Sequence, residues 1–168
     1  MFSVFLPVLI LVGLTFTVQA FLLLRRQASV KADPTILQRG ALDATVYQEE
    51  ARKVSANFTN LFETPTLFYV AAVFAILFGA TNAWTGILCW TYVLARVAHT
   101  VIHTTLNVVM IRFAAFGVSM LALLLLWVTL AFEAGGSLVF QLDEAEARRE
   151  LLVEQGLGPA LVPGYEAP

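Results

Sequence analysis

The sequence has little charge and almost no cysteine. Only 13% of its 168 residues are Asp, Glu, Lys or Arg, whereas soluble domains carry about a quarter. The ten basic residues are spread along the chain and the net charge is −2, which argues against a nucleic-acid partner. The single cysteine, Cys89, excludes an internal disulfide, and no cysteine cluster indicates a zinc site.

Hydrophobic residues make up 59% of the chain and gather in four long runs. Each run can cross a hydrocarbon core about 30 Å thick. The first run is followed, and not preceded, by Arg25 and Arg26, so we interpret it as a retained helix and not as a signal peptide. The sequence therefore predicts an all-α integral membrane protein, a four-transmembrane-helix bundle. The expected spans cover about residues 2–24, 58–79, 83–109 and 113–132.

The four spans form one expected domain, residues 1–134, and residues 135–168 form an acidic C-terminal tail. We expect the fourth span to end at Glu133–Gly136. Within the tail, Asp143–Gln155 is predicted to form a short helix with Asp143 as its cap. The remainder of the tail is rich in Gly and Pro and is predicted to be extended. Two roles are open for the tail, a solvated appendage or a segment that docks onto another membrane protein.

The loop between the first two spans holds six of the ten Lys and Arg residues. The turn between spans two and three holds none. The positive-inside rule therefore predicts a cytoplasmic loop, with both termini outside. Within this loop, Asp43–Lys53 is predicted to form a short helix with Asp43 as its cap.

The third span carries polar residues inside an apolar run. Arg96, His99, His103 and Asn107 fall within an arc of about 80° when they are placed on a helix. Such residues are costly in a membrane and usually face a bundle interior or a wet cavity.

Depth along the helices suggests a partner for this polar face. If Gly79 and Ala83 mark one interface, Glu63 and His99 lie at the same depth. We therefore expect Glu63 to neutralise Arg96, because a buried carboxylate and guanidinium are tolerated when they are paired. Two roles are open for this pair. It could be purely structural and fix the register of the bundle, or it could belong to a polar site that also contacts a ligand.

The two histidines of this face also raise the possibility of a metal site. His99 and His103 are four residues apart, so both rings could reach one ion, with Glu63 as a third ligand. The charge of Arg96 would repel a cation there, and we expect no metal.

Two short motifs support a family resemblance. NLFETP opens the second span and RVAHTVIH closes the third. With four short spans, this combination resembles the MAPEG family, the membrane-associated proteins of eicosanoid and glutathione metabolism, over about Phe2–Phe132. The sequence NLFETP followed by LFY is most similar to the bacterial branch, so the resemblance implies a multi-pass protein of a bacterial cell membrane.

The resemblance implies a homotrimer that is surrounded by membrane lipids and binds glutathione between neighbouring subunits. It also implies that the bound glutathione reacts with a lipophilic small molecule. The catalytic residue implied is Arg112, which would stabilise the glutathione thiolate. The residues implied to bind glutathione are Asn60, Glu63, Arg96, His99, His103 and Arg26.

The chain departs from the family pattern at four positions. Ala56 stands where glutathione-binding members have an arginine, and Thr59 stands where some of them have another. His103 and Phe116 stand where they have tyrosines. Two functions therefore stay open. One is a glutathione-dependent transferase or peroxidase, and the other is a non-catalytic membrane subunit that keeps the fold.

Overall fold

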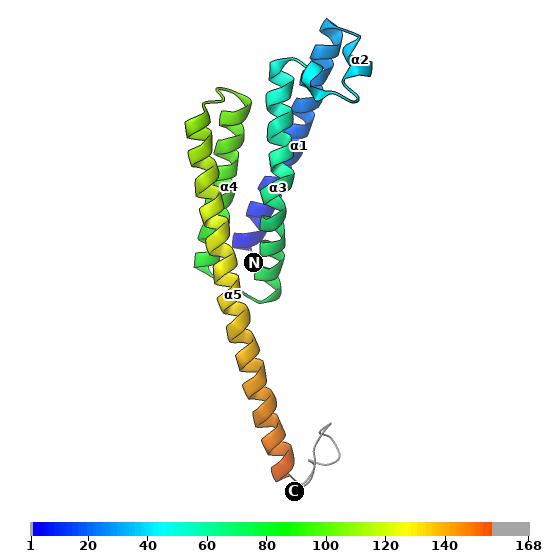
Figure 1. Cartoon of the computed structure of the whole chain (residues 1–168). Helices are drawn as coiled ribbons and strands as arrows, with labels where there is room; N and C mark the ends of the chain where they lie inside the picture. The colour runs from blue at the N-terminus through cyan, green and yellow to red at the C-terminus, as the bar shows by residue number, and fades with distance from the viewer. Residues whose placement is uncertain (1, 156–168) are drawn as a thin grey trace. The chain divides into compact units, whose positions relative to one another are not determined.

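The computed structural model describes residues 2–155, except the side chains of residues 2 and 137–139. Every regular element in this range is helical, and four helices are long and apolar enough to cross a membrane. This confirms the predicted all-α membrane fold with four spans (Figure 1). The elements are α1 (Phe2–Ala32), α2 (Ile36–Arg39), the 3₁₀ helix η1 (Ala44–Val46), α3 (Glu49–Leu77), α4 (Ala83–Thr104) and α5 (Val109–Glu154).

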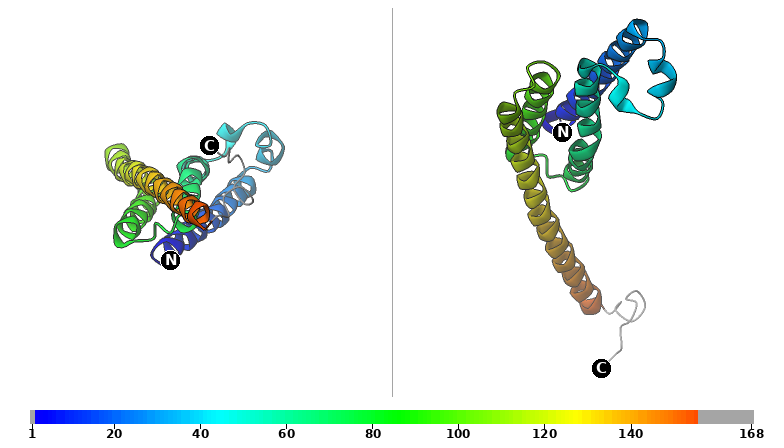
Figure 2. Two further views of the ribbon diagram at one scale, coloured as in Figure 1. Left: turned by 90° about the horizontal axis from the view of Figure 1, so that it is seen from below. Right: turned by 45° about the horizontal axis from the view of Figure 1, so that its top comes forward.

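The chain divides into two compact units, residues 1–130 and 131–168. The first unit contains α1 to α4 and the part of α5 up to Leu130. In Figures 1 and 2, α1 and α3 lie side by side, and α4 and the start of α5 form a hairpin. The described part of the second unit is the remainder of α5.

The first two spans extend further toward the loop than the hydropathy predicts. Helix α1 continues through the charged residues after Leu24 and ends at Ala32, just before Asp33-Pro34. A residue that precedes proline is disfavoured in the helical conformation, which accounts for the end. Helix α3 begins at Glu49, where two acidic residues occupy the first turn and favour the helix dipole.

The short helix predicted over Asp43–Lys53 is wrong as a single element. Asp43 does act as a cap, because its side chain accepts a hydrogen bond from the Thr45 amide at 2.8 Å. Only the three residues of η1 follow this cap, and Tyr47 and Gln48 are extended before α3 begins. The second half of the predicted helix is therefore the first turn of α3.

The ends of the last two spans also differ from the prediction. Helix α4 begins after the Asn82 cap, whose side chain accepts from the Thr85 amide at 3.0 Å, and it ends at Thr104, before the predicted residue 109. Helix α5 runs through Glu133–Gly136 without a break, so the predicted stop there is wrong. Glycine inside a helix costs only about 1 kcal/mol, which good helix formers around it offset.

The predicted tail helix lies within α5, so Asp143 is not a helix cap. Residues 156–168, predicted to be extended, lie outside the described residues.

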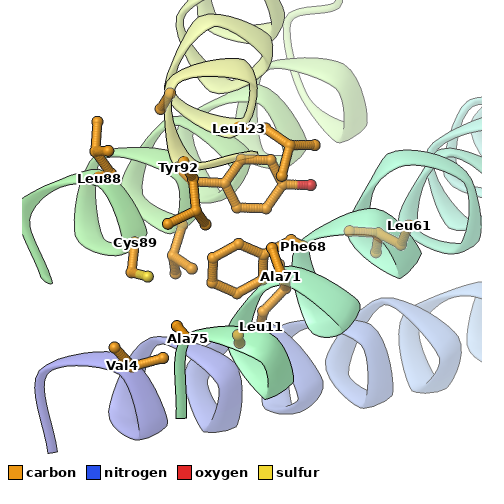
Figure 3. Packing of buried hydrophobic residues seen from close by; sticks show 14 of the residues in the cluster. Val4, Leu11, Leu61, Phe68, Ala71, Ala75, Leu88, Cys89, Tyr92 and Leu123 are labelled. Carbon is orange, nitrogen blue, oxygen red and sulfur yellow. The ribbon is translucent and has the colours of Figure 1, made fainter. Parts of the chain in front are cut away.

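The core of the first unit is built mainly from leucine, valine and alanine side chains around one aromatic pair (Figure 3). The rings of Phe68 in α3 and Tyr92 in α4 stack with centroids 4.5 Å apart and planes 14° apart. Ala71 and Ala75 of α3 face Leu11 of α1 in the same cluster, and their small side chains allow a close approach of these helices. This packing fixes which face of α4 turns inward.

Candidate functional site

The polar face of α4 lies inside the first unit. Arg96 is 0% exposed, His99 is 4% exposed and His103 is 5% exposed, although all three are among the more polar residues of the chain. They recur every three or four residues, so they follow one face of the helix. The prediction that this face turns toward the bundle interior is confirmed.

Arg96 does not meet the partner that depth matching predicts. Its Nη2 donates to the backbone carbonyl of Asn60 at 2.8 Å, and its guanidinium lies over the Phe116 ring, 5.6 Å from the centroid. Among residues 2–155, no ion pair joins Arg96 to Glu63, and the Glu63 side chain is exposed. The expected Glu63–Arg96 pair is therefore wrong for the single chain. The Nε and Nη1 atoms of Arg96 have no partner in the described chain.

Helical geometry explains why Glu63 turns away. The buried face of α3 carries Asn57, Leu61 and Phe68, which follow one another at helical spacing. Glu63 is two residues from Leu61 and so lies about 200° around the helix. The register also differs from the prediction, because Asn60 lies at the level of Arg96 and not a turn or more deeper.

Asn57 is a buried polar residue that the sequence analysis did not single out. It is 0% exposed, and its Oδ1 accepts from the Thr100 hydroxyl at 3.4 Å. Its Nδ2 has no partner in the described chain. The signal was available, because Asn57 lies one turn before Asn60 on the same helix.

The hydrogen bond of His99 shows which ring nitrogen carries the hydrogen. Its Nδ1 lies 3.1 Å from the backbone carbonyl of Arg112. A carbonyl can only accept, so Nδ1 carries the hydrogen, and a neutral ring then presents Nε2 as an acceptor. This Nε2 is buried without a partner in the described chain. His99 therefore offers a base inside the bundle.

Arg112 and Asn107 meet across the loop between α4 and α5. Arg112 Nη1 donates to Asn107 Oδ1 at 2.7 Å. Asn107 lies beyond the end of α4, with φ of 50°, so it does not share the helical face on which the sequence analysis placed it. It is still close to the polar cluster because the loop turns back toward it.

Part of this polar cluster lines one cavity of about 230 Å³. Four of the predicted site residues line it, namely Asn60, His99, His103 and Arg112. Its other lining residues are Val109, Phe113 and Phe116. The cavity thus combines a guanidinium, two imidazoles and an amide with an apolar wall.

Arg26 lies at a different place from this cavity. Its Nη2 donates to the Ser55 hydroxyl at 3.4 Å, and its guanidinium lies over the Tyr47 ring, 5.1 Å from the centroid. It lines a second cavity, of about 200 Å³, which shares no lining residue with the first. Within one chain, Arg26 therefore stands apart from the polar cluster, and Glu63 lines neither cavity.

The arrangement suits an organic ligand better than a metal ion. Within residues 2–155, no group of three or more His, Cys, Asp or Glu side chains could hold a metal. The rings of His99 and His103 meet edge to face, with centroids 5.5 Å apart. The lining instead offers a cation and hydrogen-bonding groups, which suit an anion or a polarised thiol.

Four membrane-spanning helices, with a cavity lined by polar and aromatic side chains of α3, α4 and α5, define a multi-pass helical membrane protein. The chain matches the model of the MAPEG family over residues 4–132, and it belongs to this family. No curated protein and no solved structure matches the chain. The matched range contains every residue of the polar cavity.

Proposed function

We infer that this protein is a glutathione-dependent transferase or peroxidase that acts on lipophilic substrates. The observation that carries this proposal is the cavity in which Arg112, His99, His103 and Asn60 converge within an apolar bundle. Apolar cavities with a few convergent polar groups are the usual form of a small-molecule site. Membership of the MAPEG family makes glutathione the first ligand to test.

The lining residues can activate a thiol. The thiolate, and not the thiol, is the nucleophile, and an adjacent cation stabilises it. In the proposed reaction, the glutathione thiol transfers its proton to His99 Nε2, and the guanidinium of Arg112 stabilises the sulfur anion. In the transferase reaction the thiolate sulfur then forms a bond to an electrophilic carbon of the second substrate. The attack breaks the bond from that carbon to a leaving group, which departs with the electron pair and takes up the proton held by His99. The apolar wall of Phe113 and Phe116 would receive that lipophilic substrate from the membrane.

The other polar residues have supporting roles in this proposal. The Asn60 backbone already accepts from Arg96, and its Nδ2 donates to the Ala56 carbonyl at 3.1 Å, which leaves its side-chain oxygen for a ligand. Arg96 has two unpartnered nitrogens, and His103 has an unpartnered Nδ1. These buried groups would hydrogen-bond the ligand or its water.

The cavity of one chain is small for a tripeptide. Its volume of about 230 Å³ lies below the roughly 300–1,000 Å³ of typical ligand sites. Glu63 is also exposed on a membrane-spanning helix, where a bare carboxylate is costly. Both features support a homotrimer in which a neighbouring copy covers Glu63 and completes the site. The proposal includes a bacterial cell membrane, with the loop between α1 and α3 in the cytoplasm.

A specific observation favours a second function. Ala56 and Thr59 supply no cation next to Asn60, and Phe116 supplies no hydroxyl to the cavity. A chain that binds glutathione too weakly to use it would be a non-catalytic membrane subunit, with its C-terminal tail available for docking.

Glutathione titration by calorimetry tests the proposal on the full chain in detergent. We expect binding at millimolar glutathione or below, weakened at least roughly tenfold by Arg112→Ala and by Asn60→Ala. Arg39→Ala is the matched control, because Arg39 is an exposed arginine outside the cavity. No binding at millimolar glutathione would refute the enzyme function and favour the non-catalytic subunit. A glutathione affinity that is unchanged in both cavity variants would show that the ligand binds elsewhere.

A further inference from the structure

The loop between α1 and α3 carries two exposed leucines. Leu37 in α2 is 68% exposed and Leu42 is 99% exposed, whereas the neighbouring Ile36 is buried. A single exposed leucine is ordinary on a protein surface, and two in one short loop gain meaning only from what lies next to them. The contacts of the loop show where these leucines lie.

Hydrogen bonds hold the backbone of this loop in one conformation. The Gly40 amide donates to the Ile36 carbonyl at 2.7 Å, and the Leu42 amide donates to the Arg39 carbonyl at 3.3 Å. The buried side chain of Ile36 fastens α2 to its neighbours. The exposure of Leu42 is therefore a property of the folded loop.

The loop folds back along α1 to the level of the Arg26 guanidinium. This guanidinium lies over the Tyr47 ring, 5.1 Å from the centroid. Gly40 lies against the same ring, because a Cβ atom at this position would stand 2.7 Å from the ring atoms of Tyr47. Leu42 is two residues from Gly40, and two residues span at most about 7 Å. Leu42 is therefore near the level of the Arg26 guanidinium.

The Arg26 guanidinium marks the edge of the hydrocarbon. Leu24 is 63% exposed on a membrane-spanning helix, so acyl chains would cover it. Arg26 follows two residues later, and an arginine near the end of a span directs its guanidinium toward the headgroups. Leu42, near the same level, therefore lies within reach of the boundary between headgroups and acyl chains.

The charges next to Leu42 suit the surface of a bilayer. Arg39 is exposed three residues before Leu42, where its guanidinium can meet lipid phosphates. Asp43 would oppose such a contact if its carboxylate were free. Its oxygen instead accepts from the Thr45 hydroxyl at 2.6 Å and from the Thr45 amide at 2.8 Å, so it is engaged within the loop. An apolar side chain beside a free cation is typical of segments that lie in a membrane interface.

We propose that residues 36–46 form an interfacial anchor, in which Leu42 and Leu37 insert into the boundary between the headgroups and acyl chains of the surrounding bilayer. The gain comes from apolar surface that leaves water for the hydrocarbon. A second copy of the chain would also cover the leucines, but it would not require them to lie near the level of the headgroups. The anchor does not depend on glutathione or on the function proposed for the cavity.

Site-directed fluorescence of the full chain in vesicles tests the anchor. Cys89 is 0% exposed, so a thiol-reactive NBD dye labels an introduced cysteine, and the unsubstituted chain is the labelling blank. The variants are Leu42→Cys and Leu37→Cys. The matched control is Lys31→Cys, an exposed position in the last turn of α1, about 7.5 Å beyond Arg26 along the helix.

The vesicles contain phosphatidylglycerol and phosphatidylcholine, and a fraction of the acyl chains carries a spin label that quenches NBD on contact. We expect quenching of the dye at positions 42 and 37 to be at least about twofold stronger than at position 31, because only the first two enter the acyl chains. Their emission should also shift to shorter wavelength. Leu42→Cys changes a side chain that is 99% exposed, so its melting temperature in detergent should equal that of the wild type.

A further variant shows whether the leucine or the dye drives insertion. When Leu42→Asp is added to Leu37→Cys, quenching of the dye at position 37 should fall at least about twofold, because a carboxylate resists entry into the hydrocarbon. Unchanged quenching would mean that the dye inserts by itself, and it would overturn the anchor.

Two other results would also overturn the anchor. Quenching at positions 42 and 37 that is no stronger than at position 31 would place both leucines in water. A shift to shorter wavelength without quenching by the acyl spin label would mean that protein covers the leucines. If that shift disappears when the protein is diluted in excess lipid, the cover is a second copy of the chain.

Discussion

The guanidinium of Arg112 donates a hydrogen bond to Asn107 Oδ1 at 2.7 Å across the loop that joins α4 to α5. Asn107 has φ of 50°, in the left-handed region, and its amide donates to the Ile102 carbonyl at 2.7 Å. Asparagine is one of the few residues other than glycine that adopt this conformation readily. A single residue therefore closes the end of α4 and orients the arginine that lines the cavity.

This hydrogen bond predicts that Asn107→Gly lowers the affinity for glutathione but leaves the stability of the fold nearly unchanged. Glycine accepts the left-handed backbone, so the free energy of unfolding should change by less than about 1 kcal/mol. The hydrogen bond to Arg112 is lost, and glutathione affinity should fall roughly tenfold because the guanidinium is no longer held. Calorimetry and thermal unfolding measure the two effects. Asn107→Asp keeps the acceptor oxygen and serves as the control. A glycine variant with wild-type affinity would contradict the positioning role.

Glu63→Gln tests whether another copy covers α3. The Glu63 carboxylate makes no ion pair within the described chain, so its removal should leave the intrinsic stability of one subunit within about 0.5 kcal/mol. If a neighbouring subunit binds the carboxylate, the oligomer should dissociate at higher protein concentration in the variant than in the wild type. Light scattering in detergent measures this midpoint. A large fall in the melting temperature of the isolated subunit would instead show that Glu63 pairs with Arg96 within one chain.

Arg96→Met should stabilise the fold and abolish ligand binding. Arg96 is 0% exposed, and only its Nη2 has a hydrogen-bond partner in the described chain. Replacing buried charged groups by apolar residues of similar volume is often stabilising by about 1–4 kcal/mol. We expect a higher melting temperature by tryptophan fluorescence, together with loss of the glutathione heat signal. A lower melting temperature would mean that Arg96 is a structural residue and not a ligand group.

The cap of η1 predicts a local response to acid. The Thr45 hydroxyl donates to Asp43 at 2.6 Å and the Thr45 amide at 2.8 Å, and these bonds hold the pKa of the Asp43 carboxyl below its ordinary value of 3.8. Because the folded-state pKa is depressed, the stabilisation is present above pH 3.8 and is lost as the pH falls through the lower folded value. The Thr45 amide resonance should therefore titrate with a midpoint below 3.8.

Two variants check the assignment of that titration. Asp43→Asn should remove it, because the carboxyl group is gone. Thr45→Val should move the midpoint of Asp43 upward toward 3.8, since the hydroxyl that favours the carboxylate is absent. A midpoint at or above 3.8 in the unmodified chain would contradict the hydrogen bonds to Thr45.

The four spans could be predicted from the sequence because hydropathy over about 20 residues is a local property. The helix ends could not. Helix α1 passes through Arg25 and Arg26 and α5 passes through Gly135 and Gly136, although charge and glycine suggested an end in both places. A helix that leaves the hydrocarbon can continue in water wherever the neighbouring residues favour it. Hydropathy therefore predicts which residues cross the membrane, but it does not predict where the helix ends.

The polar cavity was predictable in part. The helical spacing of Arg96, His99 and His103 indicates one inward face, and the structure brings His99 and His103 together with Asn60 and Arg112 around one hollow. The predicted Glu63–Arg96 pair was wrong because depth matching assumed that the end of α3 and the start of α4 lie at the same depth. It also ignored which face of α3 turns inward, which the packing of Phe68 against Tyr92 determines.

The sequence by itself determined the membrane class, the number of spans and the polar stripe of α4, because composition and periodicity are properties of consecutive residues. Only the tertiary structure decided that Arg96 bonds to the Asn60 carbonyl, that Asn107 holds Arg112 and that Arg26 belongs to a second cavity. These contacts depend on the register and rotation of one helix against another. Side-chain packing sets both, and no local pattern in the sequence records them.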